Sequence, residues 1–595
     1  MRTHRAAAAL LCAGLASALA VTLTDGALAR AGEHANRAAG QAAGVSVRGY
    51  DEPYAGFASV RRLREGRPAD LGLRGEPIEA ALTRLRALET EPGPSGAPLY
   101  PGSVALLGAR GRIVARQASG EAVRYSDADG TLLPADRRVP ARDDTIYDLA
   151  SISKVFTSIL VMQEAERGLD LDAPVAAYLP EFAAVGKERV TVRQLLTHTS
   201  GFEPFIPLWK LYPDKASRIA GVLAHPLKHP PGTRYVYSDL NLITLGVLLE
   251  RRTGSPLDEL LRERITAPLG MTDTGFNPDP SELPRVAATE FDAALGRGVV
   301  RGEVHDENAA SLGGVAGHAG VFATADDLAV LAQTLLNGGR YDGARILAPA
   351  TVRAMLRNQT PEFPGDGHGL GVELDQTWYM GGLAGPHTAG HTGFTGTSMV
   401  IDPASRSFAI LLTNRVHPTR TRGTINPARR ILASGLADAL PVTPRAGATA
   451  LRAGGEDGVE ATATLSVDVP ASGARLSFAT FIANDVDDRY VLERSDDDGA
   501  TWRPLTTQLR EPGRRLEVSG DLGSARGTRT WQRGTATLPP GAQLVRWRHT
   551  TDESVLGRGV YLDDIRVTTA TGAELLAVER DPDSLEVSGW TPADH

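Results

Sequence analysis

The stretch "DLASISKVF", Asp148–Phe156, places a serine three residues before a lysine at the start of a predicted helix. Residues three apart share one helix face, so Ser151 and Lys154 are expected to be neighbours. The chain has 63 basic residues, of which only five are lysines. A buried lysine, unlike an arginine, can lose its proton near neutral pH. The pair is therefore a candidate nucleophile and proton carrier, although the same pattern arises when a serine caps a helix and the lysine is merely solvated.

A tyrosine motif strengthens the catalytic interpretation. "PGTRYVYSDLNLITLG" places Tyr237 and Asp239 just before an apolar helix. A phenol held near Lys154 would act as general base toward Ser151 and later as acid toward the leaving group. Taken alone, such a tyrosine is more often a half-buried core residue, so its weight comes from its position after the serine motif.

A glycine-rich stretch supplies a third element. "GHTGFTGTSMVIDP" places His391, Thr392 and Gly393 at the head of a predicted strand. Gly393 would let a substrate backbone lie close against that edge. The backbone amides of Ser151 and Phe394 would then form an oxyanion hole.

In this order and at these separations, the three motifs resemble those of the serine β-lactamase and penicillin-binding-protein superfamily. The branch of class C β-lactamases, D-alanyl-D-alanine carboxypeptidases and esterases is the most similar. The resemblance covers roughly residues 77–440 and includes "LLTHTSGF" and "VHDENAASLGGVAGHAGVFATADDLA". It implies that Ser151 is the acylated nucleophile, that Lys154 and Tyr237 transfer protons, and that 391–393 bind substrate.

Two residues depart from the family pattern. His391 stands where most β-lactamases have lysine, which favours the peptidase and esterase members. Asp239 stands where many members have asparagine, so an amide donor for a substrate carbonyl is missing there.

The pattern of periodicities predicts an α+β hydrolase domain over residues 76–440, with an antiparallel sheet flanked by helices. The strands come from both ends of this region, and an amphipathic helix is expected from the serine motif to Gly168. A loosely ordered lead-in is expected over 30–75 and a Pro/Gly/Ala linker over 441–455. Short strands with turn signals over 456–595 predict a β-sandwich, similar to jelly-roll modules of the MAM or carbohydrate-binding type.

The N-terminus has the features of a secretory signal peptide. A short basic stretch, an alanine-rich apolar run and small residues at 27–29 predict cleavage near Arg30. The only cysteine, Cys12, lies inside this segment, so the mature chain is expected to lack disulfides and thiol chemistry. No other long apolar run exists, which predicts an exported protein, periplasmic or extracellular, without a stable membrane span.

Metal and nucleic-acid functions are weakly indicated. His387 and His391 have the spacing of a zinc pair, but Thr-Ala-Gly between them is a poor helix. "SDDDGATW" resembles a calcium-ligand string, which Asp563 and Asp564 would join, yet an Asp-Gly hairpin turn explains it more simply. The net charge of -8 without a basic cluster argues against nucleic acid. No cofactor is expected.

The sequence thus predicts a secreted serine hydrolase that forms an acyl-enzyme with an ester or a D-amino-acid peptide. Its partner would be a small-molecule or peptidoglycan-like substrate, with a glycan or cell-surface contact through the C-terminal domain. Two alternatives stay open: a penicillin-binding or glycan-binding protein with little or no turnover, and a class C-like β-lactamase.

Overall fold

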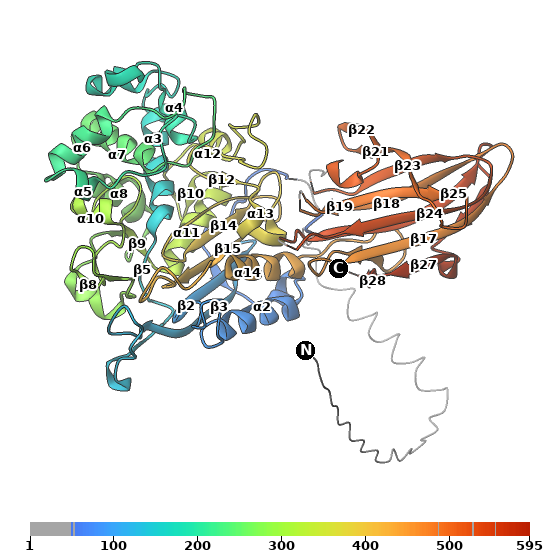
Figure 1. Ribbon diagram of the computed structural model, residues 1–595, viewed down its shortest axis with the longest axis horizontal. Helices are drawn as coiled ribbons and strands as arrows, with labels where there is room; N and C mark the ends of the chain where they lie inside the picture. Colours follow the sequence, from blue (N-terminus) through green and yellow to red (C-terminus); the bar gives the residue numbers. More distant parts are fainter. Residues whose placement is uncertain (1–48, 52–53, 486, 526–528, 554, 595) are drawn as a thin grey trace, which may run out of the picture. The chain divides into compact units, whose positions relative to one another are not determined.

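The computed structural model describes residues 49–51, 54–485, 487–525, 529–553 and 555–594 (Figure 1). The predicted signal peptide with Cys12, and the lead-in up to residue 48, lie outside the described residues. None of the helices in the described ranges combines the length and apolar character that crossing a bilayer requires.

The hydrolase region is built on one sheet with the strand order β1-β3-β2-β15-β14-β13-β12. Strand β2 pairs antiparallel with both β3, its hairpin partner, and β15, which lies about 300 residues later in the chain. Strands from both ends of the region therefore share one sheet, as predicted. The strands are β1 (Arg64–Glu65), β2 (Gly102–Ala109), β3 (Arg112–Val123), β4 (Val139–Pro140), β12 (Glu373–Leu374), β13 (Ala389–Thr392), β14 (Ser398–Asp402) and β15 (Ser407–Thr413).

Helices cover both faces of this sheet. Helix α11 packs against β2, β14 and β15 on one face, while α2 and α14 lie together on the other (Figure 1). The helices are α2 (Gly75–Ala87), α3 (Ser153–Glu166), α4 (Val192–Leu196), α5 (Leu208–Leu211), α6 (Lys215–Ala224), α7 (Asp239–Thr253), α8 (Leu257–Leu261), α9 (Ala267–Leu269), α10 (Glu307–Ser311), α11 (Ala325–Leu336), α12 (Pro349–Met355), α13 (Thr377–Met380) and α14 (Asn426–Ala439).

Helix α3 differs from the amphipathic helix that its sequence predicts. All of its residues from Ser153 to Glu164 are buried, so it has no solvent face over these turns. Several of its polar side chains instead find internal partners: Thr157 Oγ1 donates to the Gly317 carbonyl (2.8 Å), and Glu164 receives guanidinium groups. Buried polar groups are tolerated when they are hydrogen-bonded. The apolar residues do repeat with helical periodicity, but the polar face of the helix is also covered by the rest of the protein.

A small three-stranded sheet holds the start of the serine motif. Its order is β5 (Tyr147–Asp148), β9 (Val321–Ala323) and β6 (Gly275–Phe276). Both pairings are antiparallel. This sheet brings the residues just before Ser151 next to a loop that follows α10.

The C-terminal region is all-β, as predicted, and consists of antiparallel sheets around one apolar core. The larger sheet has the order β22-β21-β23-β18-β25-β16-β28, with β26 on β25, and the smaller β20-β19-β24-β17-β27. The strands are β16 (Ala450–Ala453), β17 (Glu460–Val469), β18 (Ala474–Ala483), β19 (Arg489–Ser495), β20 (Arg503–Pro504), β21 (Thr506–Glu511), β22 (Arg514–Ser519), β23 (Gln532–Leu538), β24 (Gly541–Thr550), β25 (Gly559–Thr569), β26 (Glu574–Ala577), β27 (Leu585–Ser588) and β28 (Thr591–Ala593).

Two segments that were expected to be irregular contain regular structure. In the predicted lead-in, β1 pairs in parallel with β3, and a 3-10 turn covers 68–71. In the predicted linker, β16 pairs with β25 and β28. Both strands are too short for periodicity to reveal them. Each forms because it can hydrogen-bond to a longer neighbouring strand, β3 for β1 and β25 for β16.

Candidate active site

A strained turn presents Ser151. The serine lies in a 3-10 turn, Ala150–Ile152, between β5 and α3, and Ala150 has the left-handed φ of 46°. Non-glycine residues adopt this conformation at a cost. The carboxylate of Asp148, 2% exposed, accepts hydrogen bonds from the amides of Ala150 (2.8 Å) and His305 (2.7 Å). Burial raises the pKa of Asp148 above its usual value. The sequence motifs did not single out Asp148, although it opens the stretch that contains Ser151.

Lys154 is surrounded by three acceptors. Its Nζ donates to Ser151 Oγ (2.8 Å) and to the His318 carbonyl (3.0 Å), and it pairs with Asp239 Oδ1 (2.8 Å). An ammonium has three N–H donors and no lone pair, so these acceptors and the neighbouring Tyr237 oxygen share them. Burial alone would lower the pKa of Lys154, but the charges of Asp239 and Tyr237 and the hydrogen bonds to them together outweigh it, and the pKa lies above its usual value. In this arrangement Lys154 is a cation that donates to Ser151.

Tyr237 adjoins the same pair. Lys154 Nζ lies 4.9 Å from the centre of its ring, and hydrogen bonds from Lys154 and Ser151 favour its phenolate. Burial raises the pKa of Tyr237 to about 12, with the Lys154 charge opposing that shift and Asp239 adding to it. Behind the phenol, the His198 ring packs at 4.5 Å between centroids. His198 Nδ1 accepts from the Ser238 amide (3.1 Å), so it helps to fix the loop that carries the tyrosine.

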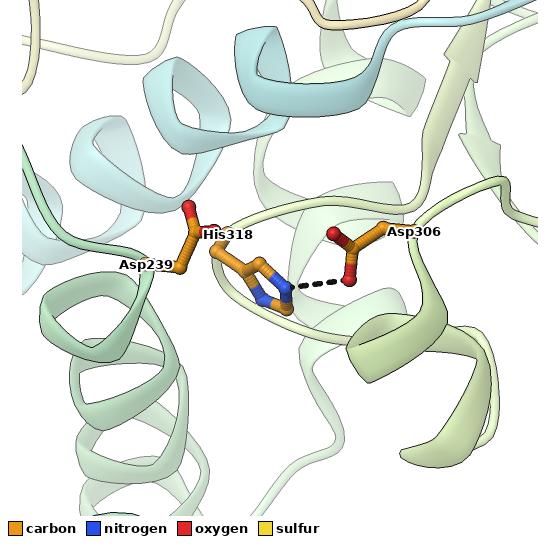
Figure 2. A group of neighbouring side chains, drawn as sticks. All are labelled: Asp239, Asp306 and His318. Carbon is orange, nitrogen blue, oxygen red and sulfur yellow. Dashed lines mark hydrogen bonds and ion pairs between the residues drawn. The ribbon is translucent and has the colours of Figure 1, made fainter. Parts of the chain in front are cut away.

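Asp239, expected to contact substrate, pairs with Lys154 and is not among the residues that line the cavity beside Ser151. Figure 2 shows it beside His318, whose Nε2 lies 2.9 Å from Asp306 Oδ1. These three side chains bring metal-ligand atoms within 4.8 Å of one another. A cation there would compete with the Lys154 ammonium for Asp239 and with His318 for Asp306. These side chains are therefore better explained as partners within the hydrogen-bonded network around Lys154 than as ligands of a metal ion.

The third motif forms the strand beside the serine. His391 is buried in β13, and its Nδ1 lies 2.9 Å from the Thr392 carbonyl. Burial, together with the charge of Lys154, lowers the pKa of His391 to about 3, so the ring is neutral at neutral pH. A side chain at Gly393 would place its Cβ 2.2 Å from the Leu149 carbonyl oxygen and 2.1 Å from Thr397 Oγ1. Close packing inside the protein thus already requires this glycine.

Two backbone amides are available for an oxyanion. Among the hydrogen bonds of the described residues, none has the amide of Ser151 or of Phe394 as its donor. The Phe394 ring is 47% exposed, stacks on His305 at 5.7 Å, and has Arg415 and Arg420 near its faces. The ring is therefore held at the mouth of the site by contacts that leave one side open.

Ser151 opens into a cavity of about 530 Å³. Thr392 and Gly393 line it, whereas Lys154, Asp239 and His391 lie behind its wall. The lining residues are Ser151, Tyr235, Tyr237, Asp366, Glu373, Gln376, Trp378, Thr392, Gly393, Phe394, Arg415, Thr424, Ile425, Asn426 and Arg429. The cationic part of this wall was missed. Its signal is an arginine two residues after the last strand of the sheet and an Asn-Pro-Ala-Arg helix start soon afterwards.

The other residues considered as metal ligands contact groups of the protein itself. His387 packs on Tyr54 at 5.1 Å, while the His391 ring lies 6.0 Å from Tyr237. Asp563 Oδ2 accepts the amides of Arg445 and Ala446. In "SDDDGATW", Asp498 and Gly499 have positive φ values of 56° and 86°, as in a two-residue hairpin turn.

Comparisons with known proteins agree with the motifs. A family model described as "Beta-lactamase" matches residues 97–434. A protein of Escherichia coli (strain K12) named "Putative D-alanyl-D-alanine carboxypeptidase" is 37% identical over 354 residues, 53% of this chain and 79% of its own. A protein of the same name from Salmonella agona is 34% identical over 367 residues, 57% and 83% of the two chains. The structure of EstCE1, a hydrolase with promiscuous acyltransferase activity, aligns with a TM-score of 0.48 at 23% identity, over 61% of this chain and 99% of its own.

Proposed function

We propose that this chain, which belongs to the β-lactamase family and is a serine hydrolase of the β-lactamase and penicillin-binding-protein type, cleaves the terminal D-amino acid from peptides. The observation that carries the proposal is the cationic wall of the cavity beside Ser151. Arg415 and Arg429 lie on it together with Asn426. A guanidinium recognises a carboxylate through charge-assisted hydrogen bonds. A peptide that ends in a free carboxylate fits this wall, and the name of the curated relatives points to the same class.

Of the two arginines, Arg415 is the better candidate for contacting substrate. Arg429 already donates to the carbonyls of Gly393 (2.6 Å) and Thr397 (2.9 Å), so it supports the strand. Arg415 donates one hydrogen bond to the Arg420 carbonyl (2.8 Å) and lies over the Phe394 ring. Its guanidinium is thus oriented at the cavity wall with donors to spare.

The proposed reaction runs through an acyl-enzyme. Ser151 Oγ attacks the carbonyl carbon of the penultimate residue, and its proton passes to Tyr237. The amides of Ser151 and Phe394 hold the oxyanion. The C–N bond breaks as Tyr237 returns the proton to the leaving nitrogen, which releases the terminal D-amino acid. Water, deprotonated by Tyr237, then cleaves the ester and restores Ser151.

In this scheme the phenolate of Tyr237 is the base. Lys154 donates to Ser151, to the His318 carbonyl and to Asp239, so it orients Ser151, and its charge stabilises the phenolate without taking a proton. Asp239 is the counter-ion that keeps Lys154 charged. Its own charge also raises the pKa of Tyr237, which makes the enzyme most active at alkaline pH.

An esterase is the second candidate, and the exposed Phe394 ring favours it. An aromatic face at the mouth of the cavity would contact the alkyl or aryl group of an ester. The neutral His391 speaks against a potent β-lactamase, because no cation stands at that position of the third motif.

The test compares three substrates on one protein. We expect an N-acylated peptide ending in D-Ala-D-Ala to release D-alanine, and the same peptide with a C-terminal amide to react about 10- to 100-fold more slowly, the effect of losing one charged hydrogen bond. Arg415→Gln should lower kcat/KM for the free acid by a similar factor and leave p-nitrophenyl acetate turnover unchanged. Arg251→Gln, an exposed arginine in α7, is the matched control.

Other outcomes identify the alternatives. Ester turnover that depends on Ser151, without D-alanine release, would make the protein an esterase. Stable labelling by a fluorescent penicillin without turnover would place it among the penicillin-binding proteins, and rapid penicillin hydrolysis among the β-lactamases. If Ser151→Ala changes none of these signals, the catalytic assignment fails.

We further propose that the protein is exported and acts in the periplasm or outside the cell. The basic, apolar and small-residue sequence of the first 29 residues supports this. N-terminal sequencing of protein expressed from the full reading frame tests it: a mature start near Arg30 supports export, and a start at Met1 in the cytoplasmic fraction contradicts it.

We also assign the C-terminal region to a jelly-roll module of the MAM type. The two antiparallel sheets with a shared apolar core support this assignment. An experimental structure whose strand order matches MAM modules would bear it out, and a different order would refute it.

A further inference from the structure

The outer face of the larger C-terminal sheet carries arginines in directly opposed positions. Arg510 on β21 is paired in register with Arg515 on β22 and with Arg533 on β23. All three side chains are exposed, and the residues on either side of Arg510 and Arg533 point the other way. Like charges directly opposite each other destabilise a sheet. We call this row of Arg515, Arg510 and Arg533 the arginine ladder.

Acidic neighbours neutralise little of this charge. Asp564 lies 3.6 Å from Arg533, but it also pairs with Arg566 at 2.7 Å. Glu517, another acid on this face, accepts a hydrogen bond from Gln508. Among the described residues, no carboxylate pairs with Arg510 or Arg515. The face thus concentrates positive charge on a chain whose net charge is -8.

The face is also hollowed. A groove of about 770 Å³ runs over β18, β21 and β23, and it is lined by Arg475, Arg494 and Arg510 as well as by hydroxyl and amide side chains. The polar residues of its lining other than arginine are Ser472, Thr506, Gln508, Glu517, Thr535 and Thr537. No tryptophan, tyrosine or phenylalanine is among the residues that line it.

We propose that the arginine ladder and this groove bind a linear anionic glycan. Guanidinium groups would pair with its carboxylates, and the threonine and glutamine side chains would bond its hydroxyls. Adjacent strands lie about 4.8 Å apart, a spacing comparable to the length of one sugar unit. Without aromatic side chains the groove offers no platform for stacked bases or for the flat faces of neutral sugars. The cross-strand repulsion is tolerated because the ligand relieves it.

Binding of the full-length mature protein to polygalacturonate tests the proposal. We expect saturable binding that weakens as salt rises, and little binding to a neutral polymer of similar length. The double variant Arg510→Gln/Arg515→Gln should lose affinity at least tenfold. Arg251→Gln/Arg262→Gln, which removes two exposed charges from helical segments of the hydrolase region, should bind like the wild type.

The outcomes separate the ligand classes and the two functions of the chain. Unchanged affinity of the double variant, or equal binding of neutral and anionic glycans, would overturn the proposal. Equal binding of duplex DNA through the same arginines would show a general polyanion surface and overturn the glycan assignment. Ester or peptide turnover by the double variant should match the wild type, because the ladder is separate from the Ser151 site.

Discussion

The positive charge beside Ser151 and those on the arginine ladder differ in their burial and in their partners. Lys154 is 1% exposed and has an acceptor for every N–H group. The ladder arginines are exposed, face one another, and gain little from acidic partners. The difference shows that a buried charge is built into the structure through its partners, whereas an exposed one mainly sets what the surface attracts. Substitutions in the two regions should therefore differ in kind.

Lys154→Met should have the largest effect. It leaves the partly buried Asp239, whose side chain is 19% exposed, without its cation, and breaking a buried pair costs at most about 3–5 kcal/mol of unfolding free energy. Loss of the cation beside Tyr237 should also reduce turnover by about 10²- to 10⁴-fold. Urea unfolding and ester kinetics measure the two effects. Lys154→Met/Asp239→Asn, which removes both charges, should regain stability but not activity. Equal stability of the single and double variants would contradict the pairing.

Gly393→Ala should come next. The added Cβ would lie 2.2 Å from a backbone oxygen that cannot move freely. Overpacking of this kind costs about 1–3 kcal/mol, and it should displace the Phe394 amide from the oxyanion. A fall in both melting temperature and kcat is expected. Gly499→Ala, in an exposed hairpin turn of the C-terminal region, would test glycine loss away from the site. Full activity of Gly393→Ala would show that the backbone around residue 393 can move enough to accommodate the added Cβ, which would contradict the prediction.

Asp239→Asn should change the pH profile, and it should also lower the stability, because it leaves the buried Lys154 ammonium without its counter-ion. Removing the carboxylate charge lowers the pKa of Tyr237, because Asp239 raises it in the wild type. The rising limb of log kcat/KM against pH should thus move about one unit toward acid. Below the limb, turnover at a fixed pH increases about tenfold. A profile that stays in place, or moves toward alkaline pH, would exclude Asp239 as the group that sets the base.

Arg510→Gln should have the smallest effect, and it should be favourable. It removes the repulsion toward two opposed arginines, which is worth a few tenths of a kcal/mol up to about 1 kcal/mol. The gain in unfolding free energy should shrink at high salt, since the Debye length falls to about 3 Å at 1 M. Calorimetry at low and high salt measures it, with Thr506→Gln as the neutral control. Destabilisation by Arg510→Gln at low salt would show that the ladder supports the sheet.

Much of the hydrolase fold could be predicted because its signals are local. Helix α7 and the strands β14 and β15 follow from apolar periodicity and turn residues close to where the structure has them. The sequence predicted that strands from both ends of the region share one sheet, but not that β2 pairs with β15. Periodicity could not show that α3 is buried on all sides, because burial depends on what the rest of the chain packs against it.

The site was predicted in its residues more than in its contacts. The structure brings Ser151, Lys154 and Tyr237 together, but it turns Asp239 toward the lysine. A sequence cannot show which of two neighbours a carboxylate will face. Arg415 was missed for a related reason. Its importance comes from lying on the same cavity wall as Ser151, and that is a property of the folded chain.

Asp148 ties the nucleophile to distant parts of the chain. Its carboxylate holds the amides of Ala150 and His305, and its own carbonyl accepts the Thr395 hydroxyl (2.7 Å). The last two partners are 157 and 247 residues further along. A chain that is still being synthesised has not yet made these contacts. Such a chain contains Ser151 but has not yet formed the turn that orients its side chain. Ser151 therefore cannot react with a peptide before the protein has folded.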